Sequence, residues 1–167
     1  MRLLTRIFAL LALLVMAPTF AAATPVAIKC GEVINSTVLV EEVATVTTST
    51  SFSTIPGASV TVTVPDGVKR CVKVLFTGET DCASSFTATN CQVRARVGTS
   101  DMRPTGSGSR DFGSAKDGSG ARAYQWVSVV SGPGKFVVTL QIAVSSSSAT
   151  FRIDDWSMDV EVSHFVP

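Results

Sequence analysis

The sequence contains a single histidine, His164, which lies close to the C-terminal end. A Ser-His-Asp site would need this imidazole beside an activated serine and an aspartate. The serines occur in runs typical of loops and strands, and the GxSxG pattern of a serine nucleophile does not occur. We therefore expect His164 to be exposed near the end of the chain, and we predict no catalytic site built on it.

Four carboxylates remain as candidates for acid-base chemistry: Glu79, Asp81, Asp154 and Asp155. A glycosidase needs two carboxyl groups held on either side of one bond, and nothing in the sequence places two of these at that separation. They define one alternative function, a secreted hydrolase that depends on carboxylates. Our main expectation is that the protein is not an enzyme.

Calcium is the metal that such residues would suit, because it prefers carboxylate oxygens. Asp154 and Asp155, or Glu79 with Asp81, could supply them, although their spacing does not match an EF-hand. Aspartates beside an irregular strand also accept hydrogen bonds from the nearby backbone. We expect no cofactor, and keep Asp154 and Asp155 as a candidate calcium site.

Tyr124 and Trp126 lie two residues apart in a strand-like segment, so their side chains share one face. Exposed, they would form an aromatic platform for a sugar or a protein; buried, they would belong to the core. The segment before them, Gly98–Gly120, is long and irregular, as binding loops on rigid scaffolds often are. The candidate binding residues are Tyr124, Trp126, Arg103, Arg110 and Phe112.

The four cysteines are Cys30, Cys71, Cys82 and Cys91, an even number that indicates two disulfides in an exported chain. Three pairings can be written. The pairing Cys82–Cys91 with Cys30–Cys71 is favoured, because the first would close a short polar loop between two strand-like runs. The geometry of the fold decides between them. Metal ligation is disfavoured, since there is no CxxC pair and only one histidine.

The first 23 residues have the features of a secretory signal peptide, namely a basic start, an apolar run and an Ala-Ala-Ala cleavage pattern. No other stretch is long and apolar enough to span a bilayer. We therefore expect an exported protein, located in the periplasm, at the cell surface or outside the cell, with residues 24–167 forming a single domain.

Removal of Arg2 and Arg6 with this peptide would leave 12 basic residues against 13 acidic ones, a net charge of about −1. Nucleic-acid binding rests on neutralising phosphates with an excess of basic residues. The charge of the mature chain therefore argues against a nucleic-acid partner.

Alternating apolar and polar residues predict strands through most of the mature chain. Turn signals separate them, including Ile55-Pro56-Gly57 and Pro65-Asp66-Gly67. No segment has a convincing helical period. Seven to ten short strands of this kind predict an all-β fold, an antiparallel β-sandwich resembling a jelly roll.

The C-terminal strand contains a change of phase. Phe151 and Ile153 are apolar at odd positions, whereas Trp156 and the apolar residues after it fall at even positions. A strand with a two-residue period changes phase only if an extra residue is inserted, so we predict a β-bulge at Asp154-Asp155.

Two segments, Val60–Cys82 and Gly132–Val162, resemble uncharacterised bacterial secreted proteins that share a strand–Pro–x–Gly–strand unit and a closing segment of the form TFxIDDWxLxVEV. These proteins look like jelly rolls of the broad C1q/TNF type, which are often trimers. The resemblance covers roughly half of the mature chain. It implies a β-sandwich and a possible homo-oligomer, and it transfers no functional residue to this sequence.

Together, these features predict a secreted or envelope-associated module that recognises a carbohydrate or a protein partner. Besides the carboxylate-dependent hydrolase, the alternative is a subunit that self-assembles into a surface layer or filament. Whether the loop at residues 98–120 and the Tyr124–Trp126 face build a concave site is the observation that would distinguish these functions best.

Overall fold

The structure is a computed structural model that describes residue 25 and residues 27–86, 89–105, 111–114 and 118–167. The predicted signal peptide and the candidate binding residue Arg110 lie outside these ranges. Within them, no helix is long and apolar enough to cross a membrane.

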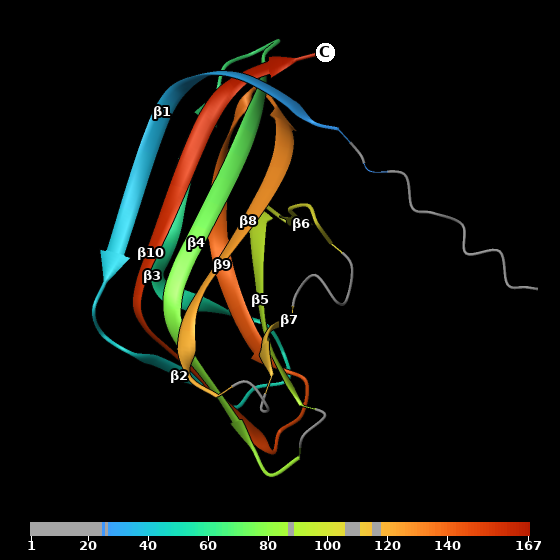
Figure 1. The fold of residues 1–167 in the computed structure, drawn as a ribbon. Coiled ribbons are helices and arrows are strands. Elements are labelled where there is room, and N and C mark those ends of the chain that lie inside the picture. The colour runs from blue at the N-terminus through green and yellow to red at the C-terminus, as the bar shows by residue number, and fades with distance from the viewer. Residues whose placement is uncertain (1–24, 26, 87–88, 106–110, 115–117) are drawn as a thin grey trace, which may run out of the picture.

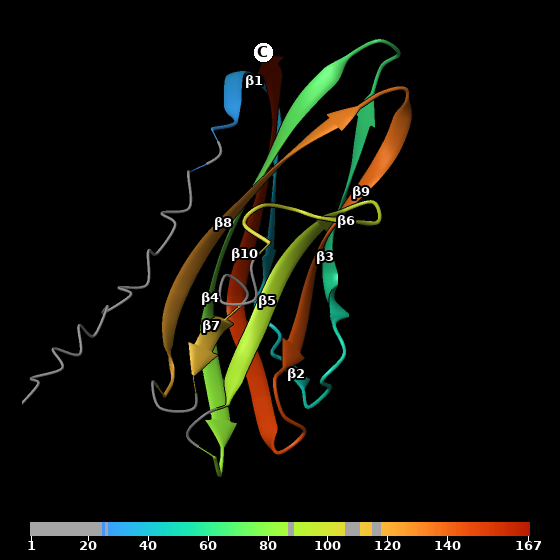
Figure 2. The same ribbon diagram turned by 90° about the vertical axis from the view of Figure 1, so that its right-hand side faces the viewer.

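The described chain forms two antiparallel sheets that face each other (Figures 1 and 2). The strands of the first sheet are β1 (Lys29–Glu41), β10 (Ala149–Val166), β4 (Lys69–Ser84) and β8 (Gly120–Ser131), in this spatial order, with the short β2 (Thr45–Thr47) also paired to β10. The strands of the second sheet are β3 (Ser53–Val64), β9 (Gly134–Val144), β5 (Asn90–Val97) and β6 (Ser100–Asp101), with β7 (Asp111–Ser114) also paired to β5.

From β3 to β5 and from β8 to β10, consecutive strands alternate between the two sheets. The chain thus wraps around the core as in a jelly roll. The prediction of an all-β antiparallel sandwich is confirmed. The same wrapping leaves β1 and β8 at the two edges of the first sheet, which matters for the sites described below.

The core lies between the sheets and is built from the inward positions of the alternating strands. Its largest fully buried side chains include Trp126, Trp156, Phe76, Phe151, Ile55 and Met102. Because each strand contributes every second residue, the apolar alternation of the sequence is the direct cause of this two-layer arrangement.

The predicted β-bulge at Asp154-Asp155 is confirmed. Asp154 pairs with Glu79 and Ser157 pairs with Thr77, so two residues of β10 oppose the single Gly78 of β4. Asp155 has a φ of 42°, in the left-handed region. This conformation turns both Ile153 and Trp156 inward, where they are 0% and 2% exposed.

Gly78 lies opposite this bulge, where a side chain would crowd Trp156. A Cβ atom at this position would lie 3.1 Å from the Cβ of Trp156, closer than side-chain atoms normally approach. The glycine therefore lets the bulged segment pack closely onto β4.

Both disulfides have the favoured pairing. Cys30–Cys71 connects β1 to β4, and Cys82–Cys91 connects β4 to β5. The first bond therefore ties an edge strand to a central strand of its own sheet, and the second holds the two sheets together.

Candidate binding cleft

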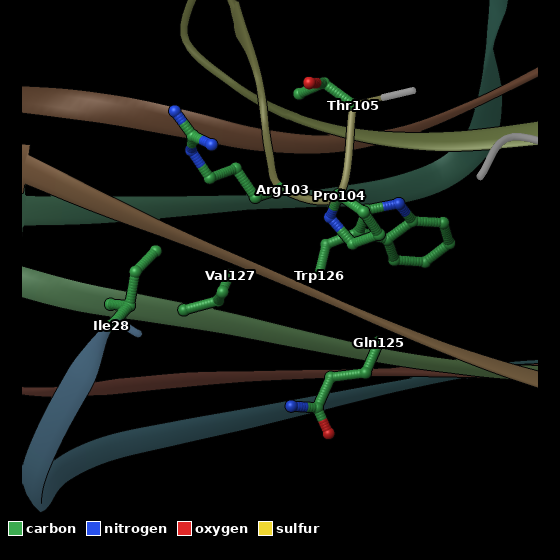
Figure 3. A pocket seen from close by; sticks show the side chains of 7 residues that line it. All are labelled: Ile28, Arg103, Pro104, Thr105, Gln125, Trp126 and Val127. Carbon is green, nitrogen blue, oxygen red and sulfur yellow. The ribbon is translucent and has the colours of Figure 1, made fainter. Parts of the chain in front are cut away.

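A cleft of about 370 Å³ lies at the β8 edge of the first sheet (Figure 3). Its lining residues come from three places in the chain: one residue before β1, three residues after β6 and three consecutive residues of β8. Its lining consists of Ile28, Arg103, Pro104, Thr105, Gln125, Trp126 and Val127. Residues 103–105, after β6, therefore form a concave site with β8.

The segment after β6 is fixed to both sheets. The Met102 N–H donates to the carbonyl of Ala95 on β5 at 2.9 Å, and the Met102 side chain is 1% exposed. Arg103 pairs with Val127 of β8 through two backbone hydrogen bonds of 2.9 and 2.8 Å, one in each direction. One residue thus anchors the segment in the core, and the next places it alongside the edge of β8.

The Arg103–Val127 pair also determines where the backbone groups of Gln125 point. Because Val127 exchanges both hydrogen bonds with Arg103, its N–H and carbonyl point away from β4. Backbone groups of residues two apart in a strand point to the same side, so the N–H and carbonyl of Gln125 also point away from β4. Among the described strands, β8 pairs only with β4. The cleft therefore presents a backbone donor and a backbone acceptor at an open sheet edge.

Trp126 lies on the inner face of β8 and is 1% exposed. Tyr124 is half-buried, and its ring centroid lies 4.8 Å from that of Trp126 with the planes tilted by 43°. This arrangement corresponds to the core alternative for the aromatic pair, not to an exposed platform. Trp126 forms part of the cleft wall while its ring packs into the core.

Phe112 belongs to the short strand β7 and is 6% exposed. Its ring centroid lies 5.5 Å from that of Phe76, so it packs in the core away from the cleft lining. Of the candidate binding residues that are described, Arg103 and Trp126 line the cleft. Tyr124 contacts Trp126 from the side.

Sequence reasoning missed most of the cleft lining. Gln125 and Val127 flank Trp126 in the sequence, and Pro104 follows Arg103, so their neighbours gave a signal that they would lie nearby. Ile28 gave no such signal, because only the wrapping of the fold brings the residue before β1 to β8.

The candidate carboxylates lie on the outer face of the first sheet, on β4 and β10. Glu79 and Asp81 line a smaller cleft of about 240 Å³ together with Arg152. In the strand register, Arg152 is opposite Asp81 and Asp154 is opposite Glu79. The outer face that carries these carboxylates therefore also carries the guanidinium group of Arg152.

Asp154 is engaged by its own strand. Its carboxylate pairs with Arg152 and also accepts a hydrogen bond of 3.2 Å from the N–H of Asp155. No group of three or more His, Cys, Asp or Glu residues that could hold a metal ion occurs in the described part of the chain. The contacts of Asp154 are those of a residue that stabilises the bulge.

His164 is exposed on β10, as expected, and its Nδ1 atom lies 3.3 Å from the Nη1 atom of Arg70. This neighbour is a guanidinium group, whereas a catalytic histidine would need a carboxylate or carbonyl to orient it. The contact therefore gives no support to a nucleophile-histidine pair.

The β8 cleft presents mixed apolar and polar groups. Its lining combines apolar side chains, a cation, a hydroxyl, an amide and an open backbone edge. Comparison with protein-family models gave no match, and no similar curated protein was found. The geometry of the cleft is consequently the main guide to function.

Proposed function

We propose that this protein is an exported recognition module without catalytic activity of its own, and that its β8 cleft binds an extended segment of a partner protein. The observation that carries the proposal is the outward-pointing backbone of Gln125 beside the Arg103–Val127 pair. An extended peptide can add to such an edge through main-chain hydrogen bonds, with its side chains entering the neighbouring cleft.

The side chains of the cleft suggest which segment would fit. Arg103 is exposed and lies beside the apolar surfaces of Ile28, Pro104 and Val127. The guanidinium group can accept a carboxylate in a bidentate arrangement, while the apolar surfaces accommodate an aliphatic side chain two residues along the peptide. The proposed ligand is therefore an extended segment with one acidic and one aliphatic residue on the same face.

A protein ligand fits this cleft better than a carbohydrate does. Sugar binding commonly uses the open face of an aromatic ring, and Trp126 is 1% exposed. The backbone pair of Gln125, by contrast, matches the donor and acceptor spacing of another strand.

The proposal of a non-catalytic role is supported by the residues that line the cleft. None of the described lining residues is a histidine, cysteine, aspartate or glutamate, so these residues supply no general base of the usual kinds to activate the Thr105 hydroxyl. The hydrolase alternative would have to use the separate cleft with Glu79 and Asp81, where Arg152 is opposite Asp81 in the strand register and pairs with Asp154.

The test uses a displayed library of linear peptides and a glycan array, both probed with the full chain carrying its two disulfides. We expect acidic-aliphatic peptides to be selected. Gln125→Pro then removes the outward backbone N–H, a loss that an edge strand tolerates, and should weaken peptide binding about tenfold, the equivalent of one hydrogen bond.

Ala123→Pro is the matched control, because Ala123 has the same orientation on β8 but does not line the cleft. It should leave binding unchanged. Arg103→Gln should weaken binding to acidic peptides while retaining the backbone pair with Val127. Binding of glycans in place of peptides, or equal effects of the two proline substitutions, would overturn the proposal.

A further inference from the structure

The opposite edge of the first sheet carries an unusual concentration of exposed apolar side chains. Among the described residues, ten large hydrophobic side chains are exposed, and six of these lie between residues 33 and 46. They are Val33, Ile34, Val38, Val40, Val43 and Val46, with exposed fractions from 48% to 70%. Isolated exposed valines are ordinary, but this clustering makes the segment a candidate interaction surface.

These residues belong to one continuous edge. β1 and β2 both pair with β10, at residues 156–166 and 151–153 respectively, and therefore follow one another along the same side of the sheet. In Figure 1, β1 forms the outer edge of the first sheet. Among the described strands, β1 pairs only with β10.

The middle of β1 lacks the devices that usually protect an edge strand. Natural edges carry charged residues or proline to prevent pairing with other chains. From Val33 to Val40, β1 has neither. Its pairing with β10 is also regular from Asn35 to Glu41, because both register shifts occur before Asn35. The result is six residues of regular, uncharged edge, Asn35–Val40, followed directly by Glu41.

We propose that β1 pairs antiparallel with β1 of a second copy of this chain, about a two-fold axis that passes through Val38. Val38 is the centre of the regular run from Asn35 to Glu41. A two-fold axis at this point lets all seven residues pair and joins the two first sheets into one continuous sheet.

The residues brought together by this axis are complementary. Val38 meets the partner's Val38, and Val40 meets the partner's Ser36, which places four valines side by side on the outer face. On the inner face, Asn35 meets the partner's Glu41, so an amide can donate to a carboxylate. No two like charges are opposite each other, and a mature net charge of about −1, from 12 basic and 13 acidic residues, opposes association only weakly.

The choice of a second copy over another protein rests on this self-complementarity. If the axis is moved by one residue to Thr37, only Asn35–Leu39 can pair within the regular run, because Val40 and Glu41 would then face residues at or before the register shift that precedes Asn35. The axis at Val38 uses the whole regular run. This pairing is independent of the β8 cleft, which lies at the other edge of the sheet.

Sedimentation velocity on the full chain with intact disulfides tests the proposal. The wild-type protein should form dimers. Val38→Lys and Val38→Glu each place two like charges opposite one another across the axis, and each should raise the dimer dissociation constant at least about tenfold. Val38 is 60% exposed, so both variants should keep the wild-type circular dichroism spectrum.

The decisive measurement is an equal mixture of the Val38→Lys and Val38→Glu variants. Opposite charges then meet at the axis, and dimers should reform. Val137→Lys is the matched control, because Val137 is 44% exposed on β9 of the second sheet and should not affect the dimer. A monomeric or trimeric wild-type protein, a mixture that stays monomeric, or an equal effect of Val137→Lys would overturn the proposal.

Discussion

β1 and β8 are the two edge strands of one sheet, yet they differ in what covers their outer edges. Beside β8, the segment after β6 supplies Arg103, which pairs with Val127 and covers part of the edge. Beside β1, no described strand other than β10 is paired, and six exposed apolar side chains occur between residues 33 and 46.

The two proposals therefore assign different kinds of interface to the two edges of one sheet. At β8, the covering segment leaves a small cleft with one open backbone pair, which suits a short, specific ligand. At β1, the edge is regular from Asn35 to Glu41 and exposes Val38 and Val40, which suits another strand of equal length. The following predictions test how differently the two strands are held.

The largest expected effect concerns the inward side chains of the two edges. Trp126→Ala on β8 should destabilise the fold by about 3–5 kcal/mol, because it empties a fully buried site. Leu39→Ala on β1 should cost about half as much, since Leu39 is half-buried at the margin of the core. Urea unfolding at a protein concentration that keeps the chain monomeric measures both.

Val38→Ala is the control for this comparison. Its side chain is 60% exposed, so the change in unfolding free energy of the monomer should stay within about 0.5 kcal/mol. Equal costs for Trp126→Ala and Leu39→Ala would mean that β1 is as deeply packed as β8, and the contrast between the edges would fail.

The next prediction concerns the disulfides. Cys30–Cys71 closes a sequence separation of 41 residues and Cys82–Cys91 one of 9. Loop-closure entropy then predicts losses of about 4 and about 3 kcal/mol for the paired alanine substitutions. Since Cys30 is on β1, the first variant should also increase amide exchange in β1 more than in β8. Unfolding curves and exchange mass spectrometry check these effects, and greater loosening of β8 would contradict the comparison.

Several features of the fold could be predicted because buried positions and turns each require particular residue types. The phase change between Ile153 and Trp156 indicated the bulge, since both residues had to be buried. The pairing of Cys82 with Cys91 followed from a short polar loop between two strand-like runs. Pro65-Asp66-Gly67 is the predicted turn between β3 and β4, and Gly67 has a φ of 66°.

Other features of the fold could not be predicted from residue types. Ile55-Pro56-Gly57 was expected to separate strands, but it lies within β3, where the register with β9 shifts between Thr54 and Ser59. Turns and bulges both use glycine at positive φ, and Gly57 has a φ of 78°, so the sequence does not distinguish them.

The candidate cleft was harder to predict than the fold. Arg103 and Trp126 were candidate residues, but the role of Gln125 depends on the direction of its backbone, which is set by the Arg103–Val127 pair. Phe112 looked like a loop residue because its partner in the core, Phe76, is distant in sequence. Properties that arise from strand pairing have no signature in residue type alone.

The smallest expected effect is at the β8 edge itself. The N–H of Val127 donates to Arg103 at 2.8 Å, whereas that of Gln125 points outward at the open part of the edge. The amide of Gln125 should therefore exchange with deuterium about tenfold faster than that of Val127, a difference equivalent to one hydrogen bond. Amide exchange followed by NMR measures the two rates in one sample. If the rates are equal, either the Arg103–Val127 pair opens readily or another group covers Gln125, and in both cases β8 would not offer the half-covered edge that separates it from β1.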